Sequence, residues 1–124
     1  MRIRLFQMRV VGWLETAFSV SLIMNHRQRN QRFLEEALEL VQSLDLTRAE
    51  AHVLVDYVFD RPAGKPTQEV GGTMVTLAAL CHAHHIDLEV ATRDEVKRIW
   101  NKIDEIRAKQ AGKPRVVNDG EHDA

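Results

Sequence analysis

The segment from Pro66 to His84 constrains the fold most strongly, because it is a predicted helix that is apolar on nearly every side from Val70 to Ala83. A helix of this kind is normally buried all round, either at the centre of a bundle or in a subunit interface. Gly71 and Gly72 each destabilise such a helix by about 1 kcal/mol relative to alanine. We therefore expect another helix to approach closely at this glycine pair.

Hydrophobic periodicity predicts helices at residues 10–25, 27–44, 47–60, 66–84 and 92–110, and no segment has a competing strand pattern. Thr47 followed by Glu50 is a capping-box pattern that predicts the start of the third helix. The stretch DRPAGKP, residues 60–66, contains two prolines and a glycine and predicts a loop. The sequence therefore predicts an all-α fold, a bundle of four to five helices.

The chain has 124 residues, of which 44% are hydrophobic, and this is enough for a single domain with one core. We predict an N-terminal extension at residues 1–9, an all-α domain at 10–111 and a disordered tail at 112–124, where the periodicity is lost. A wholly apolar helix is difficult to keep soluble in a four- or five-helix monomer, so we expect a homo-oligomer, either a dimer or a tetramer.

Charge and composition argue against several classes of partner. The 17 basic and 18 acidic residues give a formal net charge of -1, so the chain has no general attraction to nucleic acid or anionic lipid. Arg9 and Glu15 interrupt the apolar N-terminal run, which disfavours a signal peptide or a membrane anchor. Cys81 is the only cysteine and suits a reducing compartment. We expect a cytoplasmic protein without nucleic-acid or membrane partners.

A cluster of carboxylates in the second predicted helix suggests chemistry. Glu35 and Glu39 are one helical turn apart and repel each other by a few tenths of a kcal/mol. Glu36 and Glu39 are three residues apart, so their side chains can converge on one point, and carboxylate oxygens are ligands that Mg²⁺ and Mn²⁺ prefer. Glu69, at the start of the fourth helix, could add a ligand. The alternative is a solvated acidic face, with Glu69 complementing a helix dipole.

The order of these segments resembles a known family. EEALE at residues 35–39, then a helix and a loop, then QEVGGTMVTLAAL at 68–80, is similar to the MazG-like all-α nucleoside triphosphate pyrophosphohydrolases, whose signature is E-E-x-x-E followed by E-x-x-D. The resemblance covers about residues 10–110. It implies hydrolysis of a nucleoside triphosphate to the monophosphate and pyrophosphate, with Mg²⁺ or Mn²⁺ as the cofactor.

The resemblance also assigns roles by position. It implies that Glu36, Glu39 and Glu69 are metal ligands, and Glu35 matches the preceding glutamate, our candidate for orienting or deprotonating the attacking water. The match fails at Gly72, where the family motif has its aspartate. Loss of that carboxylate lowers metal affinity unless water or another acid, such as Asp56, takes its place.

Basic residues near the C-terminal end complete the expected site. The resemblance suggests that Lys102, with Arg98 or Lys109, reaches the triphosphate. The alternative is structural, because Asp94 and Arg98, like Glu105 and Lys109, have the i, i+4 spacing of acid-to-base pairs on an exposed helix.

Three functions follow from these residues. The first is a magnesium-dependent nucleotide pyrophosphohydrolase that removes surplus or non-canonical nucleotides. The second is a non-catalytic helical dimerisation or regulatory module, which Gly72 favours. The third is a pyrophosphohydrolase that acts on phosphoribosyl-ATP.

Overall fold

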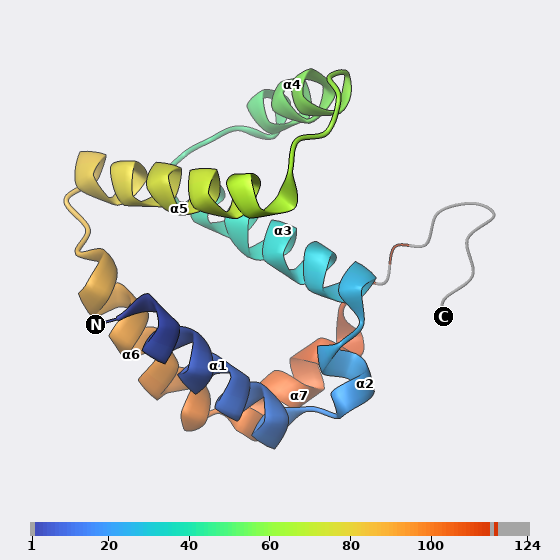
Figure 1. The fold of residues 1–124 in the computed structure, drawn as a ribbon, viewed down its shortest axis with the longest axis vertical. Coiled ribbons are helices and arrows are strands. Elements are labelled where there is room, and N and C mark those ends of the chain that lie inside the picture. Colours follow the sequence, from blue (N-terminus) through green and yellow to red (C-terminus); the bar gives the residue numbers. More distant parts are fainter. Residues whose placement is uncertain (1, 115, 117–124) are drawn as a thin grey trace. The chain divides into compact units, whose positions relative to one another are not determined.

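The computed structural model describes residues 2–114 and residue 116, and these residues form helices without any strand (Figure 1). The helices are α1 (Ile3–Ala17), α2 (Val20–Ile23), α3 (His26–Ser43), α4 (Arg48–Phe59), α5 (Pro66–Ala83), α6 (Leu88–Trp100) and α7 (Ile103–Gly112). The predicted all-α class is confirmed. None of the described helices is both long and apolar enough to cross a membrane.

The helices at the two ends differ from the sequence prediction. The first begins at Ile3 and ends at Ala17, because the Ser19 hydroxyl accepts a hydrogen bond from the Leu22 N–H (3.3 Å) and so starts the short α2. The predicted helix at 92–110 is two helices that are separated at residues 101–102. Here the Asn101 amide donates to the Lys97 carbonyl (3.1 Å), the kind of local bond that competes with helix continuation.

Two helix ends share one geometry. After α3, Asp45 has a φ of 70° and the Leu46 N–H donates to the Val41 carbonyl (2.9 Å). After α5, His85 has a φ of 56° and the Ile86 N–H donates to the Cys81 carbonyl (2.9 Å). Both are Schellman-type ends, in which a left-handed residue turns the chain sharply out of the helix. The next helix can therefore begin within a few residues of the previous one.

The predicted capping box at the start of α4 is confirmed. The Thr47 hydroxyl accepts from the Glu50 N–H (3.2 Å), and the Glu50 carboxylate accepts from the Thr47 N–H (3.1 Å). We expect Thr47→Ala to lower the free energy of unfolding by about 1 kcal/mol, because two helix N–H groups lose their partners or their geometry. Urea denaturation measures this change. Thr67→Ala, at an exposed position without a side-chain hydrogen bond among the described residues, should leave the midpoint nearly unchanged, and equal midpoints for the two variants would contradict the assignment.

The chain divides into two units, and the first comprises the described residues of Met1–Glu36 and Thr92–Ala124. Its core is around Trp13, which is buried, contacts the Phe18 ring edge-on (5.6 Å between centroids) and donates from its indole N–H to the Ile99 carbonyl (3.0 Å). Arg107 donates to the carbonyls of Ala17 (2.6 Å) and Thr16 (2.8 Å). This guanidinium satisfies carbonyls that the end of α1 leaves without helical partners.

The second unit, Ala37–Ala91, contains the end of α3 with α4 and α5, and it has little internal core. Cys81 is its only buried residue, and no residue of α4 is buried. Large apolar side chains of α4 and α5 are exposed in a single copy: Val53, Leu54, Val55, Tyr57, Val58, Phe59, Val70, Met74 and Val75. Within this unit, these helices therefore present a broad apolar surface.

The sequence predicts that the apolar helix, α5, is buried on all sides. Among the described residues of the second unit, α5 is not buried all round, and a Cβ built on Gly71 or Gly72 meets nothing within 4 Å. Within this unit, the predicted close approach of another helix to the glycine pair is not seen.

Candidate functional site

The acidic cluster lies on α3, which begins where the Asn25 side chain accepts a hydrogen bond from the Gln28 N–H (3.1 Å). Glu36 and Glu39 are exposed, and Glu35 is half-buried. The helix continues unbroken from the first unit into the second, and the boundary falls directly after Glu36. The three carboxylates therefore keep the helical spacing on which the sequence prediction depends.

Glu35 is held by two basic side chains. The Lys113 ammonium donates to one of its carboxylate oxygens, and Arg32 Nη1 is 3.5 Å from the other. The hydrogen bond from Lys113 lowers the pKa of the Glu35 carboxyl, partly opposed by burial and supported by the charges of Lys113 and Arg32. A carboxylate with a lowered pKa is a weaker proton acceptor at neutral pH. This pairing therefore favours the orienting role for Glu35 over deprotonation of water.

The start of the C-terminal segment lies along α3. Arg32 Nη2 donates to the Pro114 carbonyl (2.9 Å), and the Gln31 side chain donates to the Val116 carbonyl (2.7 Å). Sequence reasoning missed these contacts, because a loss of periodicity predicts the end of a helix and not what an extended segment binds. Of the predicted disordered tail, residues 115 and 117–124 lie outside the described part of the chain.

Glu69 lies in the first turn of α5, which begins at Pro66 as the sequence predicted and has Lys65 at its N-cap position. Its side chain folds back over Gly64 in the preceding loop. A Cβ built on Gly64 would be 3.3 Å from the Glu69 Cδ and closer still to a carboxylate oxygen. Glycine at position 64 thus leaves room for the carboxylate, and any larger residue must displace it.

The predicted ligands are suited to Mg²⁺ in kind, since all three are hard carboxylate donors. Among the described residues of one chain, however, no three His, Cys, Asp or Glu side chains are close enough together to hold a metal ion. Glu36 and Glu39 share one helix, and Glu69 belongs to another.

The basic candidates have local partners. Arg98 donates from Nη2 to Glu95 (3.0 Å), and Lys102, the N-cap of α7, is 3.4 Å from Glu105. Glu95 and, more weakly, Glu36 raise the pKa of Arg98. In these observed pairs the acid and the base are three residues apart, whereas the sequence suggested pairs four residues apart. Lys109 makes no ion pair with any other described residue.

No protein-family model matches the chain, and neither does any curated protein or solved structure.

Proposed function

We propose that this protein is a magnesium-dependent nucleoside triphosphate pyrophosphohydrolase of the MazG-like type, acting in the cytosol. The observation that carries the proposal is the run Glu35, Glu36 and Glu39 on one continuous helix, followed by Glu69 in the first turn of another. The all-α fold and the E-E-x-x-E sequence are compatible with this family.

Glu36 and Glu39 act as the paired ligands from α3. They are exposed, and their i, i+3 spacing lets both carboxylates turn toward one cation without distortion of the helix. These carboxylates would hold a Mg²⁺ ion, which would supply positive charge to neutralise the phosphates and to lower the pKa of the attacking water. Glu35, held by Lys113 and Arg32, orients that water through its carboxylate. No covalent intermediate is required.

A second copy of the chain completes the set by contributing Glu69. The exposed apolar side chains of α4 and α5 support this assembly, because uncovered surfaces of this kind mark interaction sites. Phe59 is 81% exposed and Leu54 51% exposed in a single copy. Burial of these residues against a symmetry-related copy gives a dimer, or a tetramer built from two dimers.

Lys102, Arg98 and Lys109 provide positive charge for the triphosphate. Lys109 has no ion-pair partner among the described residues, so it can bind phosphate without breaking an existing interaction. Arg98 and Lys102 must exchange exposed contacts with Glu95 and Glu105, and exposed ion pairs contribute little to stability. Such an exchange therefore changes the stability of the folded protein little.

A second candidate function is a non-catalytic helical dimerisation module with the same fold. Gly72 favours it, because the motif aspartate is missing at that position. Calorimetric titration with Mn²⁺ separates the two candidates. Binding that Glu36→Gln abolishes supports the enzyme, whereas a folded protein that does not bind Mn²⁺ supports the module.

The direct test is pyrophosphate release from a panel of canonical and modified nucleoside triphosphates, with Mg²⁺ or Mn²⁺. We expect release of equal amounts of monophosphate and pyrophosphate, and none in the presence of a chelator. Phosphoribosyl-ATP belongs in the same panel, because turnover of that compound alone would redirect the assignment. A folded protein that releases no pyrophosphate from any member would refute the proposed activity.

A further inference from the structure

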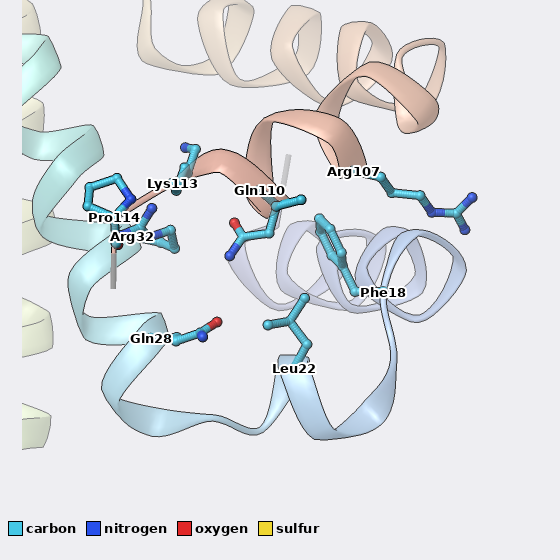
Figure 2. Close-up of a pocket in the computed structure, with 9 residues that line it drawn as sticks. Phe18, Leu22, Gln28, Arg32, Arg107, Gln110, Lys113 and Pro114 are labelled. Atoms are coloured by element: carbon cyan, nitrogen blue, oxygen red, sulfur yellow. The ribbon is translucent and has the colours of Figure 1, made fainter. Parts of the chain in front are cut away.

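A cavity of about 300 Å³ lies in the first unit, beside the N-terminal half of α3. Its lining residues are Phe18, Leu22, Gln28, Arg32, Arg107, Gln110, Ala111, Lys113 and Pro114 (Figure 2). All of them belong to one unit, and none is a proposed metal ligand. The cavity is at the lower end of the size range of small-molecule sites.

Positive charge predominates around this cavity. Arg32 and Lys113 line it, and Arg29 is half-buried one helical turn before Arg32. Glu35 is the carboxylate that Arg32 and Lys113 contact, so two cationic groups share a single anion, and Arg29 adds a third positive charge on the same helix. The Arg107 guanidinium is directed away from the other lining residues in Figure 2 and binds the end of α1, so only its stem contributes.

Two arginines have buried N–H groups without acceptors. Among the described residues, Nε of Arg29 and both Nε and Nη1 of Arg32 are closed to solvent and make no hydrogen bond. Arg32 has only 15% of its side chain exposed. A buried N–H donor on a charged group destabilises the folded protein when it has no acceptor. Each of these N–H groups is therefore a position at which a ligand oxygen can accept a hydrogen bond. Burial and the nearby charge of Arg32 also lower the pKa of Arg29.

The walls indicate what kind of anion fits. Phe18, Leu22 and Pro114 supply apolar surface, and the amide of Gln110 supplies a polar group near Arg32 and Lys113. Guanidinium groups match the geometry of phosphate oxygens, to which they donate two parallel hydrogen bonds. A ligand with a phosphate at one end and a ring or other apolar group at the other satisfies both parts of the lining.

We propose that this cavity binds a small organic phosphate monoester, with the phosphate on Arg32 and Lys113 and the apolar part against Phe18 and Leu22. Rotation of the Arg32 guanidinium toward the cavity gives up its hydrogen bond to the Pro114 carbonyl and its ion pair with Glu35, and it gives the N–H groups that have no hydrogen bond phosphate oxygens as acceptors. Arg29 supports the anion by its charge. The site does not depend on the proposed hydrolase activity.

Calorimetric titration of the full chain with phenyl phosphate tests the site, in buffer that contains a chelator so that no metal contributes. We expect saturable binding that is several-fold tighter than that of inorganic phosphate, because the ring buries apolar surface. Arg32→Gln should weaken it by about tenfold or more, since a charge-assisted pair is lost. Arg93→Gln, which removes the same charge from an exposed position on α6, should change it less than about twofold.

A measurement on the unmodified protein tests the same site without depending on whether the Arg32→Gln variant folds. The Nε–H signals of its arginines in ¹⁵N–¹H spectra should include one, assigned to Arg32, that shifts during the same titration. Absence of detectable binding at phenyl phosphate concentrations up to about 10 mM would overturn the proposal. So would equal weakening by Arg32→Gln and Arg93→Gln, or binding that leaves the Arg32 signal in place. Pyrophosphate release is not part of this test, so the two proposals fail independently.

Discussion

Replacement of Glu36 by glutamine is expected to lower pyrophosphate release by about 10² to 10³-fold and Mn²⁺ affinity by at least about tenfold. Glutamine preserves the size of the side chain but removes a negative charge and replaces one oxygen with a donor that repels the cation. Glu36 is exposed and forms no hydrogen bond or ion pair with another described residue, so the fold should not depend on it. Steady-state kinetics and calorimetric titration measure the two effects.

Asp94→Asn is the matched control. Asp94 is an exposed carboxylate on α6 without a hydrogen bond or ion pair among the described residues, so its loss changes the net charge equally but removes no proposed ligand. We expect this control to keep near-normal turnover and Mn²⁺ binding. If Glu36→Gln behaves like Asp94→Asn while circular dichroism shows both folded, Glu36 is not a ligand and the metal assignment must be withdrawn.

The helices could be predicted where local chemistry determines them. Thr47 with Glu50 marked the start of α4, and Pro66 marked the start of α5, because a capping side chain or a proline acts within one turn. The breaks at Ser19 and Asn101 could not be predicted from periodicity, since apolar spacing continues across both. At these points the Ser19 hydroxyl accepts from the Leu22 N–H and the Asn101 amide donates to the Lys97 carbonyl, local bonds that compete with a continuous helix.

The candidate site shows a different limit. The i, i+3 spacing of Glu36 and Glu39 is a property of any helix and could be read from the sequence. The pairing of Glu35 with Lys113 could not, because it joins residues far apart in the chain through a segment without periodicity. Likewise, the packing of α4 and α5 depends on what covers their apolar residues, which are exposed within the second unit. Sequence patterns identify such residues as interface candidates but do not specify what covers them.

Disruption of the α4 surface should therefore separate the copies and stop catalysis together. Leu54 and Val58 are one turn apart, and each is 51% exposed in a single copy. We expect Leu54→Glu to convert a dimer or tetramer into a monomer, because a carboxylate cannot be buried without a partner. Mn²⁺ binding should fall in parallel. His52→Glu adds a charge at another exposed α4 position and should leave the assembly intact. Light scattering after size-exclusion chromatography measures the size of the assembly. A wild-type protein that is monomeric in this measurement would contradict the predicted interface.

Mixed assemblies give the more decisive result. If Glu36 and Glu39 come from one copy and Glu69 from the other, Glu36→Gln and Glu69→Gln chains are each inactive alone but complement each other. A mixed dimer then contains one intact metal set and one that lacks both glutamates. With random pairing in a symmetric dimer, half of the dimers are mixed and each has one working site, so activity should return to roughly a quarter of the wild-type value. If each chain supplied its own complete set, no mixed dimer would have an intact site and mixing would restore nothing. Co-expression of the two variants with different affinity tags therefore determines whether one copy or two build the metal centre.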